Sequence, residues 1–245
     1  MRKRAPLGVL CVLWASAVFF AGIAGHAGNP NVKGKITGQD KLVPDVYAEA
    51  AKPESRRWTW REPSPSVAAQ FRSLSANPSR DLCIAATTSG NAGPQEAIRM
   101  TVTGGRVFPT TIVVSPGTPL AFKNFDPFKH RLYVVNNPSF KAEDMAPNQV
   151  RSWSAAGAGK YEVRDELFPS VRTYVIVDPQ VVQVAYPGRD GAFGLSLPAG
   201  DYVLKAFFAG KQVGKPTQVV AKDKSTFEMK DPLNVAGPAE GGDPK

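Results

Sequence analysis

His130 is the first residue to consider for chemistry, because imidazole is the commonest metal ligand and a frequent acid–base catalyst. The sequence holds two histidines and two cysteines. Past the apolar N-terminal stretch only His130 and Cys83 are left. One of each gives no Ser–His–Asp or Cys–His arrangement. The neighbouring carboxylates Asp165 and Glu166 are adjacent in the chain, where side chains usually diverge. We therefore expect no enzyme activity.

The residues before His130 form a recognisable pattern. They read Phe-Pro at 108–109, Val-Val-Ser-Pro-Gly-Thr at 113–118 and Phe-Lys-Asn-Phe-Asp-Pro-Phe-Lys-His at 122–130. This pattern resembles a cupredoxin of the plastocyanin and azurin type, in which the histidine is the first copper ligand. The family's second ligand loop reads Cys-x-x-His-Pro-x-Met, and residues 165–171 here read Asp-Glu-Leu-Phe-Pro-Ser-Val.

The resemblance implies a cupredoxin scaffold with a degenerate copper site. Asp165, Phe168 and Val171 stand where the family has its thiolate, its second imidazole and its thioether. A blue-copper centre requires those groups, so we expect no cofactor and no type 1 copper. A two-ligand site for Cu(II) or Zn(II) from His130 and Asp165 is the open alternative. The other interpretation is that His130 is structural and that Phe168 fills the space of the metal.

The same resemblance suggests which residues hold the loops in place of a metal. Asn124 matches the asparagine that ties neighbouring loops together in cupredoxins, and Asp126 and His130 are candidates for similar hydrogen bonds. Cys83 is far from this loop in sequence, and Met145 does not fall at the axial position. Cys83 lies in an apolar run, so we expect it to be buried. Pairing of Cys83 between chains is the alternative in an oxidising compartment.

The fold class follows from short apolar runs separated by 22 glycines and 22 prolines. Such punctuation is typical of an antiparallel β-sandwich. We predict an all-β, Greek-key cupredoxin-like sandwich over residues 28–178, with Gly104 and Gly105 in a hairpin turn. The predicted strands are 32–36, 43–48, 82–87, 98–103, 111–115, 119–124, 131–135, 150–154, 159–164 and 173–178.

A second β module is predicted over residues 179–230. The run from Gly191 to Leu204 reads G-x-F-x-L-x-L-P-A-G-x-Y-x-L, and its alternation predicts a hairpin. It resembles carboxypeptidase regulatory-like, transthyretin-like modules. A cupredoxin followed by such a module resembles exported bacterial proteins labelled methylamine-utilisation-like, over residues 31–49 and 98–222. We expect residues 231–245 to be a disordered tail.

The N-terminus has the features of a secretory signal over residues 1–27. Three basic residues precede an uncharged apolar run, and small residues follow it. The run is short for a membrane span, although a retained anchor is the alternative. We therefore expect a periplasmic or secreted protein that contacts the membrane only through an uncleaved signal. The formal net charge is +9, but the basic residues are scattered, so no nucleic-acid partner is expected.

The insertion at 50–80 is the predicted contact element, with a short amphipathic helix over 66–74. Tryptophan and arginine are enriched in binding hot spots. We predict a non-enzymatic structural or interaction protein of the cell envelope with a protein partner. The alternatives are a glycan-binding β-sandwich and residual copper binding or electron transfer. The candidate partner-binding residues are Arg56, Arg57, Trp58, Trp60 and Arg61.

Overall fold

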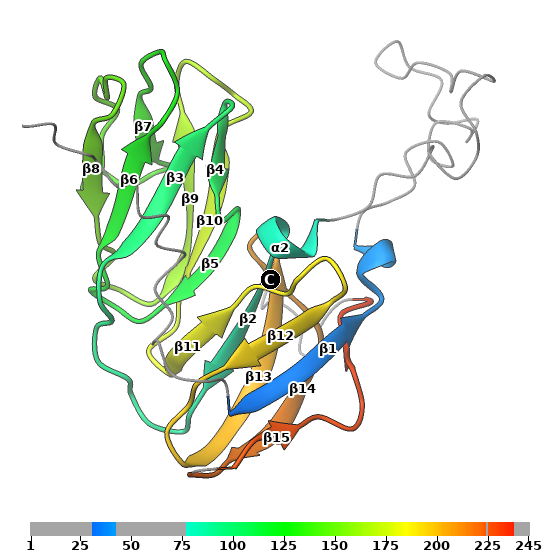
Figure 1. Cartoon of the computed structure of the whole chain (residues 1–245). Coiled ribbons are helices and arrows are strands. Elements are labelled where there is room, and N and C mark those ends of the chain that lie inside the picture. The colour runs from blue at the N-terminus through cyan, green and yellow to red at the C-terminus, as the bar shows by residue number, and fades with distance from the viewer. Residues whose placement is uncertain (1–30, 43–76, 224, 238–245) are drawn as a thin grey trace, which may run out of the picture.

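A computed structural model describes residues 31–42, 77–223 and 225–237, and Figure 1 shows that the regular secondary structure of these residues is almost entirely strand. The helical elements there are a 3-10 turn at Gln39–Lys41 and the helix α2 at Pro78–Asp81. The predicted all-β class is confirmed. The strands are β1 Val32–Thr37, β2 Leu82–Thr87, β3 Ile98–Thr103, β4 Arg106–Phe108, β5 Thr111–Val114, β6 Leu120–Asn124, β7 Leu132–Val134, β8 Val150–Trp153, β9 Gly159–Asp165, β10 Arg172–Val177, β11 Val181–Ala185, β12 Ala192–Leu195, β13 Gly200–Phe208, β14 Lys211–Ala221, β15 Phe227–Glu228 and β16 Leu233–Asn234.

The first sandwich comprises β3 to β10, with sheet orders β4-β3-β6-β8 and β5-β10-β9-β7. Its core forms because alternate residues face inward: Leu120, Phe122 and Asn124 of β6 are buried, while Ala121 and Lys123 between them are not. The predicted glycine turn is present, since β3 and β4 pair antiparallel on either side of it. Parallel pairs join β3 to β6 and β5 to β10, so the chain crosses repeatedly between the two sheets.

The second sandwich draws on both ends of the chain. One sheet has the order β11-β2-β13-β14, and the other consists of β12-β1-β15, with β16 also paired to β1. Strands β1 and β2 therefore precede the first sandwich in sequence and belong to the second. The predicted unit 28–178 contains these two strands, whose hydrogen-bonding partners lie beyond residue 180.

The predicted hairpin after Gly191 is wrong, although its alternation is right. Phe193 and Leu195 of β12 and Tyr202 and Leu204 of β13 all point into one core. The two strands do not pair with each other, because β12 pairs with β1 and β13 pairs with β2 and β14. The Pro-Ala connection at 198–199 thus carries the chain from one sheet to the facing sheet. A crossing of this kind keeps both apolar faces inward, as a hairpin does.

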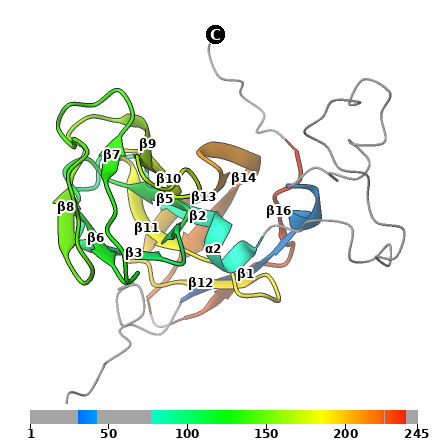
Figure 2. The same ribbon diagram turned by 90° about the horizontal axis from the view of Figure 1, so that it is seen from above.

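The two sandwiches pack against each other through β2, β5, β10, β11 and β13. Every residue of β2 is buried, because its even-numbered side chains enter the second core and Cys83 and Ala85 enter a third cluster with Val113, Ile176 and Phe207. Figure 2 shows β5, β2 and β11 together at the centre of the molecule. Hydrogen bonds cross this boundary from Tyr186 Oη to the Thr111 carbonyl, at 3.2 Å, and from the Ala209 amide to Thr111 Oγ1, at 3.1 Å.

The predicted tail begins too early. Leu233 and Asn234 form β16 against β1, and the side chains of Leu233 and Val235 are buried in the second core. Two apolar side chains with a place in the core outweigh the glycine and proline content of the segment. The predicted signal at 1–27, the strand at 43–48 and the helix at 66–74 lie outside the described residues. Among the residues described, no helix has the length and apolar character of a membrane span.

Candidate functional site

His130 lies at one end of the first sandwich, between β6 and β7. Its backbone forms an antiparallel bridge with Met145, with hydrogen bonds of 3.0 and 2.8 Å between the two residues. The side chain is 0% exposed. The imidazole of His130 is thus buried beneath the surrounding loops and does not reach the surface.

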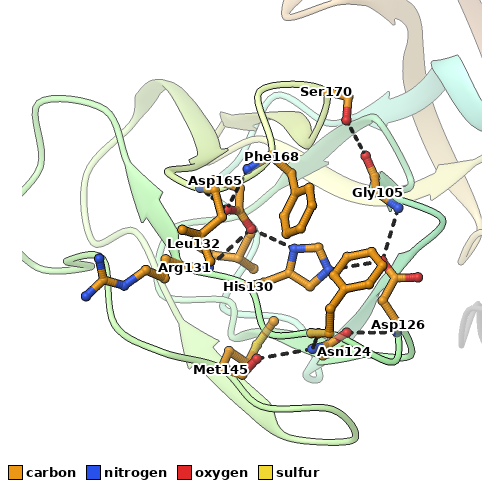
Figure 3. Close-up of polar contacts among 12 residues, drawn as sticks. Gly105, Asn124, Asp126, His130, Arg131, Leu132, Met145, Asp165, Phe168 and Ser170 are labelled. Atoms are coloured by element: carbon orange, nitrogen blue, oxygen red, sulfur yellow. Dashed lines mark hydrogen bonds and ion pairs between the residues drawn. The ribbon is translucent and has the colours of Figure 1, made fainter.

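Both nitrogens of the imidazole face carboxylate oxygens (Figure 3). His130 Nδ1 lies 2.7 Å from Asp165 Oδ2, and His130 Nε2 lies 3.0 Å from Asp126 Oδ2. Each ring nitrogen is therefore engaged by a carboxylate. The result is a buried Asp–His–Asp network that joins the β6–β7 loop to the end of β9.

Backbone amides complete the hydrogen bonding of both carboxylates. The amides of Gly104 and Gly105 donate to Asp126 at 2.6 and 3.0 Å. The amides of Leu167 and Phe168 donate to Asp165 Oδ1 at 2.6 and 3.1 Å, and the Arg131 amide donates to Oδ2 at 3.2 Å. Buried charges are tolerated when they are paired and hydrogen-bonded in this way.

The pKa of Asp126 is set by opposing effects. Burial acts to raise it, but the hydrogen bonds from the Gly105 and Gly104 amides and from His130 together hold the pKa of this carboxyl below its ordinary value. Hydrogen bonds to the ionised form stabilise that form. The lowered pKa of Asp126 therefore depends on the β3–β4 turn, which supplies the two glycine amides, and on His130.

Asn124 braces the same loops, as the resemblance implied. Its amide nitrogen donates to the carbonyls of Phe128 and Met145, at 2.9 and 3.1 Å, and its side-chain oxygen accepts from the Asp126 amide at 2.8 Å. The side chain is completely buried. All the polar atoms of this asparagine are thus used to hold the histidine loop and the Met145 segment together.

Aromatic rings cover the network. The ring centroids of Phe128 and Phe168 lie 5.2 and 5.1 Å from that of His130, and they lie 4.6 Å from each other. Figure 3 shows Phe168 against the imidazole. Phe168 also packs on the first core. Phe125, Phe128 and Leu167 in the same loops are exposed large hydrophobics.

Both ring nitrogens of His130 contact carboxylates on opposite sides of the ring. The alternative of a two-ligand metal site from His130 and Asp165 stays an expectation, and in this structure the two side chains contact each other directly at 2.7 Å. No group of three or more potential ligands converges anywhere in the described part of the chain.

The remaining sequence candidates lie apart from a common centre. Val171 is a core residue of the first sandwich, and Met145 contributes its backbone and a buried side chain. Glu166 diverges from Asp165 and forms a surface ion pair with Arg131 at 3.1 Å. The five partner-binding candidates of the insertion lie outside the described residues.

Cys83 is buried, as predicted, in β2 at the boundary between the sandwiches. Burial raises the pKa of its thiol to about 12, against the effect of hydrogen bonds from the Val113 backbone and Tyr186. The same burial raises the pKa of the Tyr186 phenol, and the neighbouring Cys83 raises it further. Cys83 is therefore a packed apolar residue and no part of the His130 network.

The glycine amides are the part of the network that sequence reasoning missed. Gly104 and Gly105 were interpreted only as turn residues. Both have positive φ, at 60° and 64°, and this conformation aims two successive amides at one carboxylate. Successive amides of this kind form an anion-binding concavity. The sequence signal for this contact is a Gly-Gly turn at 104–105 together with an aspartate, Asp126, two residues after Asn124.

Several solved structures resemble part of the chain. Amicyanin from Paracoccus versutus is 18% identical, covering 39% of this chain and 97% of that one, with a TM-score of 0.31. A purple cupredoxin from Nitrosopumilus maritimus is 14% identical over 33% of this chain and 98% of that one, with a TM-score of 0.30. A Cu-containing nitrite reductase from Thermus scotoductus is 16% identical over 38% and 25%, with a TM-score of 0.31.

At these values the copper sites and activities of the neighbours do not transfer to this chain. No protein-family model and no curated sequence matches it. The loop chemistry described above therefore comes from the residues of this chain alone. It consists of an Asp–His–Asp network where the cupredoxin pattern would hold copper.

Proposed function

We propose that this chain is a non-enzymatic, exported interaction protein of the cell envelope that uses its first sandwich as a copper-free scaffold. One observation carries the proposal: both nitrogens of His130 are engaged by buried carboxylates, at 2.7 and 3.0 Å. A residue engaged in this way stabilises loops and has no free atom for redox or acid–base work. Copper handling and hydrolytic chemistry are disfavoured for the same reason.

The loops that the network stabilises carry a surface suited to protein contact. Phe125 is 48% exposed, Leu167 is 41% exposed and Phe128 is 38% exposed. We call these three side chains the end patch. Their loops are fixed from below by the Asp–His–Asp network and Asn124, so little conformational entropy is lost when a partner binds. Exposed apolar side chains on ordered loops commonly mark interaction sites.

Charged side chains surround the end patch and would select among partners. Lys123 lies 4.7 Å from the ring centroid of Phe125. Asp144 forms ion pairs with Lys129 at 2.8 Å and with Arg131 at 2.7 Å. An apolar centre with a polar rim is the usual anatomy of a protein–protein interface. We infer an envelope protein as the partner.

The proposal is tested by cross-linked pull-down of the tagged mature protein from native envelope. One variant is Phe125→Ser with Leu167→Ser, which removes the end patch. A second replaces Arg56, Arg57, Trp58, Trp60 and Arg61 with alanine, because the insertion remains a proposed contact element. The control is Val220→Ser, which removes a similarly exposed apolar side chain from β14 of the second sandwich.

The expected result is one envelope protein that is captured by wild type and by the control and lost from one of the two contact variants. Metal analysis of the purified protein should show no stoichiometric copper. Recovery of polysaccharide in place of protein would replace the proposal with the glycan-binding function. Stoichiometric copper that disappears in His130→Ala would overturn the copper-free scaffold.

A further inference from the structure

The outer sheet of the second sandwich contains an interrupted β-ladder. Strand β1 pairs in parallel with β15 at Val32 and Lys33, and with β16 at Ile36 and Thr37. Gly34 and Lys35 lie between these pairings. The Met229 amide still donates to the Lys33 carbonyl at 2.9 Å, and the chain then leaves β1 over residues 230–232. Pro232 lies in that excursion and cannot donate to a ladder. The edge of the sheet beside β1 is consequently interrupted between β15 and β16.

A hollow of about 660 Å³ occupies this opening. That volume is in the range of small-molecule sites. Its apolar lining includes Gly34, Ala192, Phe193 and Met229. Its charged lining includes Lys33, Lys35 and Lys230.

Gly34 lies on the core face of β1, opposite to the face that carries Lys33 and Lys35, and apolar side chains fill the space above it. A Cβ atom at this position would lie 2.7 Å from the Phe193 ring and 2.6 Å from the Met229 sulfur. These two side chains close over the glycine and belong to the edge of the second core. Methionine is flexible and polarisable, so it adapts to apolar ligands of varied shape. The floor can thus accept an alkyl chain.

The charge around the hollow is predominantly positive. Lys33 and Lys35 are two apart on β1 and project from the same face of the strand, and Lys230 stands on the opposite side of the gap. All three are exposed. None of them has an ion-pair partner elsewhere in the described part of the chain. Asp190 and Glu228 also line the hollow, which leaves one net positive charge.

We propose that this hollow binds a single-chain amphiphile with an anionic headgroup, with the chain on Phe193 and Met229 and the headgroup at the lysines. The headgroup chemistry is a carboxylate or a phosphate, both of which match lysine ammonium groups. The Phe193 ring is 6% exposed, so an alkyl chain reaches it when the half-buried, flexible Met229 side chain moves aside. This site is independent of the end patch and of the proposed envelope partner.

The test is calorimetric titration of the full mature chain with dodecanoate and, separately, dodecyl phosphate, below their critical micelle concentrations. Acetate and inorganic phosphate report the headgroup alone, and dodecyltrimethylammonium reports the chain with the opposite charge. The variants are Lys33→Ser with Lys35→Ser, and Met229→Gln. The charge-matched control is Lys141→Ser with Lys211→Ser, two exposed lysines away from the hollow.

We expect 1:1 binding of at least one anionic probe, weakened about tenfold or more by the Lys33/Lys35 pair, which corresponds to about 1.4 kcal/mol. Met229→Gln should weaken the binding of the dodecyl probes. The Lys141/Lys211 control pair should bind them as tightly as wild type does. The stronger of the two anionic probes identifies the headgroup. Equal binding of the cationic amphiphile, equal binding by the Lys33/Lys35 variant, or no binding of either anionic probe would overturn the site.

Discussion

Asp165 lies 2.7 Å from Nδ1 of His130, at the chain position where the cupredoxin pattern has its cysteine thiolate. The Asp126, His130 and Asp165 side chains, together with the backbone amides that surround them, join the loops at this end of the sandwich. These contacts are made by protein groups alone.

The substitution Asp165→Asn should lower the free energy of unfolding by about 3 kcal/mol or more, because it leaves the buried imidazole with one carboxylate partner and sets an amide group against backbone donors. Asp144→Asn is the matched control. Asp144 pairs with Lys129 and Arg131 at the surface, where salt screens the interaction, so stability should hardly change. Urea denaturation followed by circular dichroism measures both. Equal midpoints for the two variants would show that the buried network does not stabilise the fold.

Acid should weaken the fold through Asp126. Its pKa is lower in the folded chain than the ordinary aspartate value of 3.8, with burial opposed by the Gly105, Gly104 and His130 hydrogen bonds. The unfolded state therefore binds more protons in this range, and the stabilisation from Asp126 is complete above about pH 4 and is lost as pH falls through the folded value.

The variant Asp126→Asn isolates this contribution. It should be less stable than wild type at pH 6, and the difference should shrink as pH falls below 4, because wild type then loses the same interaction. Urea midpoints at half-unit pH intervals provide the measurement. A difference that stays constant from pH 6 to pH 3 would contradict the assignment.

Metal should have no effect on the network. We expect the same thermal midpoint before and after treatment with EDTA, and no intense visible absorption band on addition of Cu(II). The reason is that both imidazole nitrogens are already committed to carboxylates. His130→Gln is the comparison variant. Copper-induced stabilisation that is present in wild type and absent in this variant would disagree with the hydrogen-bonded assignment of the ring.

Period-two alternation was enough to predict the class of fold and most strands of the first sandwich. Predicted strands such as 98–103 and 159–164 match β3 and β9 to within one residue. Alternation reports which face is buried, and it carries no information on which strand is the partner. This is why Phe193 and Tyr202 were placed in the right core with the wrong pairing. The assignment of β1 and β2 to the second sandwich depends on contacts more than 100 residues away in sequence.

The site was predictable in part for a similar reason. The replaced ligands at 165, 168 and 171 are visible in the sequence, and so is the asparagine at 124. The interaction of His130 with two aspartates is not visible, because it depends on three loops that meet at one end of the sandwich. The lysine-lined hollow could not be predicted either, since it arises where β15 and β16 leave a gap beside β1.

Cys83 should resist thiol reagents in the folded protein. It is completely buried and burial raises the pKa of its thiol to about 12, so both access and thiolate formation are suppressed. At pH 8, a colorimetric thiol reagent should label the native chain far more slowly than the chain in urea. The unfolded chain is the control. Rapid labelling without denaturant would mean that the boundary between the two sandwiches opens readily.

Gly34→Ala should destabilise the second sandwich, because its new methyl group would meet the Phe193 ring at 2.7 Å and the Met229 sulfur at 2.6 Å. Overpacking of this kind costs about 1–3 kcal/mol. Alanine restricts the unfolded chain slightly more than glycine does, which recovers part of that cost. The matched control is Gly93→Ala, where nothing lies within 4 Å of the added methyl group and stability should be unchanged or slightly higher. Urea denaturation midpoints of the two variants provide the measurement. A Gly34→Ala protein as stable as the Gly93→Ala control would mean that Met229 moves aside and that the hollow is more adaptable than these contacts indicate.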